Sequence, residues 1–431
     1  MAQERRAFRR RRMLIRDEII LDPAAPLPAN VEPPAGPLCR SVLIGDIHID
    51  ERVRPLWLAP GRGTAMPVCG VREPAPGVDA LIWLERNRDR FPLAANRGNG
   101  RVRLYFDARA TFEHILFEGY RPPVRVPAMA RAPFDYHKIP GSVRGAAARA
   151  ITIARMRAQA PASWWRPRFP VEIAPTVLHH ALCLCAGSQP PSQEITVILT
   201  HDVDEASSVR GAGALAEIES ARGLRSAWFV AGKLFRGSRD WIRSLVATGH
   251  EIGLHGLRHD FRFAFLPEAR LRAELDSASQ WIEEFGIRGF RSPHYLRTET
   301  MLRVLAERFA YDSSVPDCDA FSPCAPGGCG IPRPFMRKGL LEIPVTLPFE
   351  IPWMKGTAPE RLAEFWRGKL DFCRDSGGVV VVNTHPDAHA SGNRRMRAAY
   401  ARLLDELRSR GARFLPPGDI AQMRNGNHGH A

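Results

Sequence analysis

From residue 195 onwards, short apolar runs alternate with longer amphipathic segments. The runs are rich in β-branched residues and too short for helices, so they predict buried strands at 195–204, 226–232, 250–256, 289–293, 309–314, 340–348 and 379–386. The amphipathic segments predict helices at 213–223, 240–249, 267–286, 298–309, 359–377 and 393–411, several of which end at glycine. Repeated βα units predict a parallel (β/α) barrel that is either complete or, with seven strands, incomplete.

The preceding half of the chain is less regular. Residues 1–40 are basic and then Pro-rich, which predicts a tail and linker. Residues 41–190 mix strand-like runs, such as 41–50, with helical segments at 141–159 and 171–186, so we expect an additional N-terminal α/β region of unassigned role. The sequence QPPS at 189–192 marks the predicted boundary to a catalytic domain at 191–431.

The composition is that of a globular protein, but it is strongly basic. The chain has 431 residues, a formal net charge of +15 and a pI near 10.1. Such a balance attracts phosphorylated carriers, anionic membranes or nucleic acid. Arginines are scattered and not interleaved with aromatic residues along one helix, which argues against nucleic acid. The sequence contains no apolar run long enough for a membrane span or a secretory signal, so we expect a cytoplasmic protein.

The eight cysteines are expected to be reduced thiols in a chain with no visible export signal. Cys318, Cys324 and Cys329 lie close together in a Pro/Gly-rich stretch. Their spacing lacks the C-x-x-C pairs of structural zinc sites, so a zinc site there is not favoured.

The first strand of the barrel ends in Asp202 and Asp204. Alternate residues of an extended chain point to the same side, so this spacing puts both carboxylates in one small volume. One could hold a metal ion while the other acts as a base. An aspartate at a strand end also commonly forms a turn, and the pair by itself leaves both interpretations open.

More polar groups follow later strands. His255 and His259 have the spacing that places two rings on one side of a helical turn, although H-x-x-x-H also occurs by chance. Arg291 and His385 follow two further strands. Active sites of parallel barrels form at the C-terminal ends of the strands, so four such motifs favour an active site there. His250 precedes its strand and is interpreted as structural.

Together these motifs resemble the polysaccharide deacetylase family, the NodB-like esterases of carbohydrate esterase family 4. The resemblance covers about residues 194–424, with the motifs THDVD (200–204), GHEIGLHGLRHD (249–260), RSPHY (291–295), YDSS (311–314) and NTHPD (383–387). The roles that it implies are a general base at Asp202, metal ligands at Asp204, His255 and His259, a residue orienting the base at Arg291, a general acid at His385, and an oxyanion-holding backbone N–H near His294 and Tyr295. One carboxylate oxygen and two imidazole nitrogens suit Zn²⁺ or another divalent transition metal.

The sequence departs from the family pattern in three places. Val203 separates two aspartates that are adjacent in most members, as in a divergent branch that includes allantoinase-like enzymes. Tyr295 stands where glycine is usual. The carboxylate that should orient His385 is unassigned, with three candidates: Asp312, Asp317 and Asp319.

The resemblance implies a metal-dependent hydrolase that removes an acetyl group from an N-acetylated sugar. The basic composition suggests a substrate linked to a nucleotide or lipid pyrophosphate carrier and contact with an anionic membrane. Two alternatives remain open: an allantoinase-like hydrolase of a non-sugar C–N bond, and a catalytically inactive protein that binds glycans or nucleic acid. Retention of every catalytic residue type argues against the inactive protein.

Overall fold

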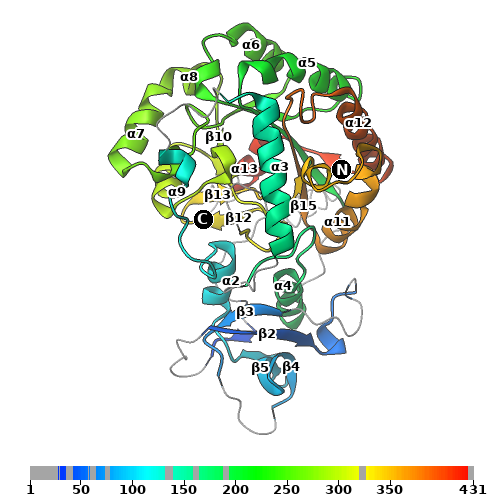
Figure 1. Ribbon diagram of the computed structural model, residues 1–431. Coiled ribbons are helices and arrows are strands. Elements are labelled where there is room, and N and C mark those ends of the chain that lie inside the picture. The colour runs from blue at the N-terminus through cyan, green and yellow to red at the C-terminus, as the bar shows by residue number, and fades with distance from the viewer. Residues whose placement is uncertain are drawn as a thin grey trace, which may run out of the picture.

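The computed structural model describes residues 28, 30–34, 42–56, 58, 65–72, 78–131, 139–158, 165–187, 194–319 and 327–425. The predicted boundary at 189–192, Cys324 and almost all of the predicted tail lie outside these residues. Figure 1 shows a larger α/β body above a smaller sheet, with helix α3 (Gly141–Ala158) running across the front of the larger body.

The larger body is a curled sheet of parallel strands surrounded by helices. Its strands include β7 (Thr196–Val203), β8 (Ala227–Val230), β9 (Glu251–Leu254), β10 (Gly289–Phe290), β11 (Tyr311–Asp312), β13 (Leu340–Glu342), β14 (Leu347–Pro348) and β15 (Val379–Thr384). They are neighbours in the order β13-β11-β10-β9-β8-β7-β15-β14, and all of these pairs are parallel. Two short strands flank them: β12 (Phe335–Arg337), antiparallel to β13, and β16 (Arg413–Phe414), parallel to β7.

One chain segment joins the two edges of this sheet. Strands β13 and β14 both belong to residues 340–348, which pair with β11 at their start and with β15 at their end. Between them, the amide of Val345 donates a hydrogen bond to the carbonyl of Val315, and the side-chain hydroxyl of its neighbour Thr346 accepts one from the amide of Val381. Within the described residues, the sheet is therefore the seven-stranded form of the two barrels that the sequence left open, with residues 340–348 as one of its seven segments.

Helices cover the outside of the barrel. They are α5 (Ala206–Ser220), α6 (Arg239–Ala247), α7 (Glu268–Ser277), α8 (Ser279–Glu284), α9 (Glu299–Leu305), α10 (Ile351–Met354), α11 (Leu362–Ser376), α12 (Arg394–Ser409) and α13 (Pro417–Asn425). The predicted helix 267–286 is two helices that meet at Ala278. No helix in the described ranges is both long and apolar enough to span a membrane.

The period of two along the strands divides the barrel into an inner and an outer layer. On β7, Val197 and Leu199 belong to the large core between strands and helices, whereas Ile198 belongs to a smaller core with Phe229 and Val381. The smaller core fills the barrel interior. Residues separated from Ile198 by an even number of positions along β7 therefore point into the barrel.

The smaller sheet has the strand order β1-β6-β5-β4-β2-β3. Its strands are β1 (Val31–Glu32), β2 (Val42–Ile49), β3 (Ala65–Cys69), β4 (Ala80–Arg86), β5 (Asp89–Asn96) and β6 (Val102–Leu104), mostly antiparallel. Helices α2 (Ala108–Leu116) and α4 (Ala174–Cys185) pack on it and share its core. The predicted mixed α/β character of this region is confirmed.

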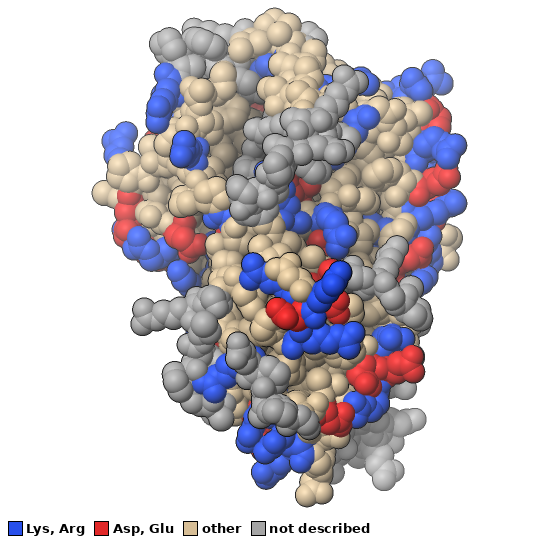
Figure 2. All heavy atoms as spheres, turned by 60° about the horizontal axis from the view of Figure 1, so that its bottom comes forward, with Lys and Arg blue, Asp and Glu red and all other residues tan. Residues whose placement is uncertain are grey.

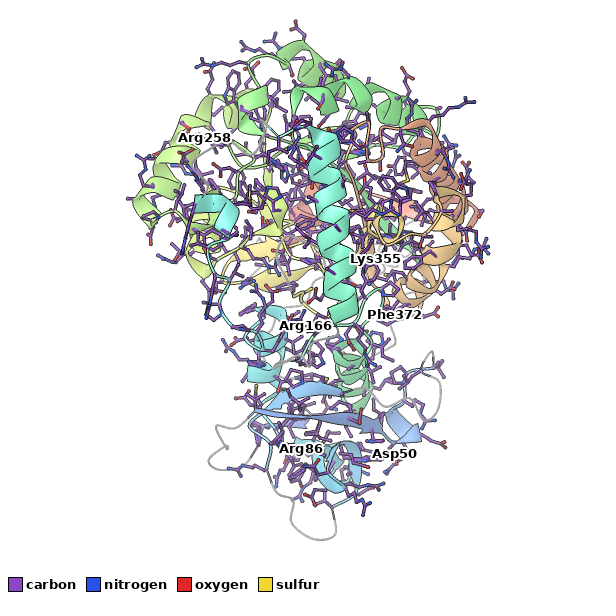
Figure 3. The ribbon with its side chains drawn as sticks, in the orientation of Figure 1. Asp50, Arg86, Arg166, Arg258, Lys355 and Phe372 are labelled. Atoms are coloured by element: carbon purple, nitrogen blue, oxygen red, sulfur yellow. The ribbon has the colours of Figure 1, made fainter. Side chains whose placement is uncertain are left out.

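Buried polar contacts join the smaller sheet's helices to the barrel. Glu118, just after α2, forms an ion pair with Arg297, and both side chains are almost fully buried. Tyr120 donates a hydrogen bond to the backbone oxygen of Gly328 at 2.6 Å. Arg166, labelled between the two bodies in Figure 3, pairs with Asp319 at 3.0 Å.

Charged side chains are mixed on the surface. Figure 2 shows Lys and Arg spread over the visible face with Asp and Glu among them. Close pairs of opposite charge among the described residues include Arg52 with Asp79 and Arg103 with Glu32. The visible face thus fits the sequence interpretation of scattered arginine. The described cysteines are free thiols, as predicted.

A buried carboxyl pair lies on adjacent barrel strands. Asp312 of β11 and Glu342 of β13 are direct neighbours in register, and both are fully buried. Asp312 accepts hydrogen bonds from the hydroxyl and the amide of Ser314, whereas no donor among the described residues reaches Oε2 of Glu342. Burial and the neighbouring Asp312 raise the pKa of Glu342 well above its usual value. Glu342 therefore carries the proton and directs it at Asp312.

We expect Glu342→Gln to be more stable than the wild type at pH 8 but not at pH 4. Folding raises the pKa of this carboxyl. As the pH rises above the pKa that the group has in the unfolded chain, the folded state becomes less stable, because only the unfolded chain can release the proton easily. Glutamine keeps an acceptor for the amide of Val315 and a donor for Asp312 without that pH dependence. Urea unfolding at both pH values should show a gain of about 1 kcal/mol or more at pH 8. An equal difference between the two proteins at both pH values would contradict the shared proton.

Candidate active site

The strands place the sequence-predicted residues at one end of the barrel. Asp204, His255, Arg291 and His385 each directly follow the last residue of a strand: β7, β9, β10 and β15 respectively. Asp202 is the penultimate residue of β7 and shares the inward parity of Ile198. All five side chains therefore meet at the C-terminal end of the barrel, as the strand-end rule predicted.

Asp204, His255 and His259 form a group suited to a metal ion. Each offers one ligand atom, and these atoms lie within 4.8 Å of one another. Oδ1 of Asp204 lies 3.3 Å from Nε2 of His255 and 3.2 Å from Nε2 of His259. That oxygen is buried, and no described residue gives it a hydrogen bond. A divalent cation would satisfy it, so this donor set fits the predicted metal.

Backbone geometry and outer contacts aim the two imidazoles. Nδ1 of His255 lies 2.9 Å from the carbonyl oxygen of Arg291. Since a carbonyl can only accept, Nδ1 carries the proton and Nε2 is left as the ligand. The turn that follows uses Gly256 at φ +59°, where a Cβ would come within 2.8 Å of Pro293. His259 itself has φ 53°, which turns its ring back towards Asp204.

Arg291 fixes the carboxylate of Asp202. The guanidinium is fully buried and gives Asp202 Oδ1 a hydrogen bond of 2.8 Å, while Nδ2 of Asn383 gives Oδ2 one of 2.9 Å. Burial raises the pKa of Asp202, but the charge of Arg291, followed by those of His255 and His385, outweighs burial and lowers the pKa to about 2. Asp202 is therefore ionised at neutral pH.

Further contacts hold Arg291 in one orientation. Its Nε donates to the carbonyl of Ser313 at 2.9 Å and its Nη2 to the hydroxyl of Ser313 at 2.8 Å. Nη1 also reaches Thr200 and Asn383, and the guanidinium lies 4.2 Å from the ring centre of Phe229. All three guanidinium nitrogens and one face of the group are thus engaged, so its position relative to Asp202 is fixed.

His385 is oriented by Glu350. Nδ1 of His385 lies 3.3 Å from Oε2 of Glu350, and the backbone amide of His385 donates to Oε1 at 2.7 Å. Nε2 faces the cavity, 3.7 Å from Oδ2 of Asp202. Burial alone would lower the pKa of His385, but Glu350, followed by Asp204 and Asp202, raises it well above its usual value.

The sequence candidates for this carboxylate were wrong. Asp312 pairs with Glu342 as described above, and Asp319 pairs with Arg166. Asp317 forms a buried ion pair with Lys369. A signal was available, because Glu350 lies two residues after β14 and the strand-end rule applies to that strand as well.

His294 and Tyr295 sit in a strained turn beside the metal group. Both have positive φ, 58° and 54°. The ring of His294 stacks on Phe261 with 3.9 Å between centroids and lies 4.7 Å from the ring of His259. The Tyr295 hydroxyl accepts a hydrogen bond from Asn383, and burial raises its pKa. The sequence motifs contain Asn383 and Thr200 but indicate no role for them. In the structure, Asn383 donates a hydrogen bond to Asp202, and Thr200 accepts one from Arg291.

These groups share one cavity of about 530 Å³. Asp202, Asp204, His255, His259 and His385 lie along one part of its wall. Other lining residues come from elsewhere in the chain: Tyr295, Pro348, Glu350, Ile351, Trp353 and Met354, together with residues of α3 (Gly141–Ala158). The volume and the mixture of apolar wall with convergent polar groups suit a small-molecule or sugar site.

A model of the polysaccharide deacetylase family matches residues 190–308. Over these residues the chain is similar to the polysaccharide deacetylase family. The matched segment contains the metal group, Asp202 and Arg291, and ends before Glu350 and His385. The resemblance that the motifs predicted is confirmed, and it supports a hydrolase.

Comparison with solved structures gives similar chains. A protein assigned as a polysaccharide deacetylase, from Mycobacterium smegmatis, is 24% identical, with 56% of this chain and 93% of that chain covered and a TM-score of 0.46. One assigned in the same way from Pseudomonas aeruginosa PAO1 is 18% identical, with 57% and 97% covered and a TM-score of 0.46. An allantoinase is 18% identical, with 57% and 97% covered and a TM-score of 0.44. A search of curated proteins found no match.

Proposed function

We propose that this protein is a polysaccharide deacetylase, a metal-dependent hydrolase that removes the acetyl group from an N-acetylated sugar in a glycan or a glycan precursor. The observation that carries the proposal is the convergence of three different groups on one cavity: the Asp204, His255 and His259 ligand set, the Asp202–Arg291 pair, and the His385–Glu350 pair. Amide hydrolysis needs an activated water, a polarised carbonyl and a proton donor for nitrogen.

Asp202 is suited to act as the base. A divalent cation, when bound, supplies a Lewis acid that polarises the acyl oxygen and makes water easier to deprotonate. Oδ2 of Asp202 lies 4.0 Å from Nε2 of His255 and 3.7 Å from Nε2 of His385, so it faces the space between them. An ionised carboxylate there takes the proton of a water that adds to the acetyl carbon. Arg291 keeps the carboxylate ionised and oriented.

His385 is suited to act as the acid. Its pKa is raised, so the imidazolium persists at neutral pH, and Nε2 faces the cavity. It gives its proton to the sugar nitrogen as the C–N bond breaks, releasing acetate and the amine. A low-pKa base and a high-pKa acid in one site give a bell-shaped pH profile with a broad neutral plateau.

His294 and Tyr295 line the cavity beside the metal ligands, where they would contact the bound substrate. The amide of Tyr295 donates to the carbonyl of Ser292 at 3.0 Å. An oxyanion role for that amide therefore requires this hydrogen bond to be shared or exchanged when substrate binds.

Acetate release tests the proposal. Purified protein loaded with Zn²⁺ is incubated with N-acetylated monosaccharides, oligosaccharides and nucleotide sugars, with allantoin as a non-sugar C–N substrate. We expect acetate from an N-acetylated sugar, loss of that activity with a chelator, and its return on adding metal. Hydrolysis of allantoin alone, or chelator-resistant acetate release, would reject the proposal.

A further inference from the structure

Helix α3 forms part of the wall of the active-site cavity. It precedes the segment that matches the family, yet Arg144, Gly145, Ala146, Ala148 and Arg149 all line the cavity. Four of them, at i, i+1, i+4 and i+5, lie on one side of a helix, and Ala146 at i+2 borders that side, so α3 turns one broad face towards the site. Figure 1 shows α3 crossing the front of the barrel, which agrees with this placement.

Small residues on that face of α3 leave the cavity open, and an arginine on it anchors the helix to the barrel. Gly145, Ala146 and Ala148 have little or no side chain, so the helix covers the cavity without filling it. The guanidinium of Arg144 forms an ion pair with Glu205, the residue that follows the metal ligand Asp204. The contact ties α3 to the metal-bearing end of β7.

The charges lining the cavity are almost all compensated. Asp202 is paired with Arg291, Glu205 with Arg144, and Glu350 with His385. Asp204 belongs to the metal group. Asp387 accepts hydrogen bonds from the hydroxyls of Ser207 and Ser208, and burial and Asp204 raise its pKa.

Arg149 is the exception. Its side chain lines the cavity and is exposed, and no described residue gives it an ion pair or a hydrogen bond. A guanidinium at a cavity wall with no carboxylate partner offers paired N–H donors to a carboxylate or a phosphate. Among the described residues that line the cavity, Arg149 is therefore the guanidinium left to meet a charged group of a substrate.

We propose that α3 is a wall of the substrate site and that Arg149 binds an anionic group attached to the acetylated sugar. The anion is the carboxylate of an acidic sugar or the phosphate of a carrier, which share this chemistry. The inference rests on the proposed function, because it assumes that the cavity receives the glycan. It gives the N-terminal region a role in substrate selection.

Binding to a non-hydrolysing protein tests the site. Full-length, Zn²⁺-loaded Asp202→Asn is titrated calorimetrically with three probes: UDP-N-acetylglucosamine, a hyaluronan tetrasaccharide and neutral chitotetraose. The same titrations are repeated with two double variants. One combines Asp202→Asn with Arg149→Ala, and the other, the matched control, combines Asp202→Asn with Arg86→Ala. Arg86 is an exposed arginine on the smaller sheet, away from α3 in Figure 3.

We expect Arg149→Ala to raise the Kd of one anionic probe about tenfold relative to chitotetraose, as for loss of a charged hydrogen bond. Arg86→Ala should not change that ratio. The affected probe identifies phosphate or carboxylate as the source. An unchanged ratio for both anionic probes, equal weakening of all three probes, or no binding of either anionic probe would overturn the proposal.

Acetate release from chitotetraose by the wild type is measured in parallel. If acetate is released but Arg149→Ala leaves the Kd of both anionic probes unchanged relative to chitotetraose, the anion site is rejected and the proposed deacetylase function stands. Arg149-dependent binding without acetate release from any N-acetylated substrate rejects the deacetylase but keeps the anion site.

Discussion

Asp204→Ala is expected to lose both the metal and acetate release, whereas Asp202→Asn is expected to keep the metal and lose only turnover. Oδ1 of Asp204 lies within 3.3 Å of both imidazole nitrogens, so its removal takes away one of three ligands and the only anionic one in that group. Asp202 lies outside the group and is held by Arg291 and Asn383. Asparagine preserves its shape but cannot take a proton.

Metal content and rate together separate the two roles. Metal analysis of the purified variants should give about one ion per chain for the wild type and Asp202→Asn, and far less for Asp204→Ala. Acetate release by Asp202→Asn should fall by about 10²- to 10⁴-fold, the usual contribution of a general base. Asp260→Ala is the matched control, because Asp260 adjoins His259 in sequence but lies outside the ligand group. Wild-type metal content in Asp204→Ala would overturn the ligand assignment.

The parts of the site that sequence predicted are those fixed by strand periodicity. Asp202 and Asp204 share the inward parity of Ile198, and His255, Arg291 and His385 directly follow their strands. Because parallel strands present their C-terminal ends on one side, residues far apart in the chain had to meet there. The barrel and its seven segments follow from the same repeat.

The parts that sequence missed depend on packing between segments. Glu350 follows the predicted strand 340–348, so the strand-end rule offered it as a candidate, but its pairing with His385 depends on β14 lying beside β15. The pairing of Asp312 with Glu342 depends on register between two strands of two and three residues. The position of α3 over the cavity could not be inferred from its Ala-rich pattern, which gives the helix no strongly apolar face.

Glu350→Gln is expected to move the alkaline limb of the pH profile to lower pH and to reduce acetate release at pH 8 to 9 by about 10²-fold, at the lower end of the range for general acid catalysis. The charge and hydrogen bond of Glu350 are the largest effects that raise the pKa of His385 against burial. Without that charge, burial favours the neutral imidazole. The proposed reaction needs His385 as the imidazolium, so activity falls as the pH rises through the pKa of His385. A lower pKa therefore moves this fall to lower pH.

The position of the alkaline limb distinguishes this electrostatic effect from simple disruption of the fold. Glutamine can still accept from the amide of His385 and the hydroxyl of Ser391, which Oε1 of Glu350 holds at 2.7 and 2.6 Å, so the loop after β15 should remain in place. Activity should therefore recover towards the wild-type value as the pH is lowered, whereas a misfolded variant would stay inactive at every pH. Glu342→Gln is the matched control, since it makes the same substitution at another buried carboxyl of the barrel, one that does not contact His385. Because His385 is the only group in the proposed reaction that must be protonated, an alkaline limb that stays in place in Glu350→Gln would mean that another group supplies the proton to the leaving nitrogen.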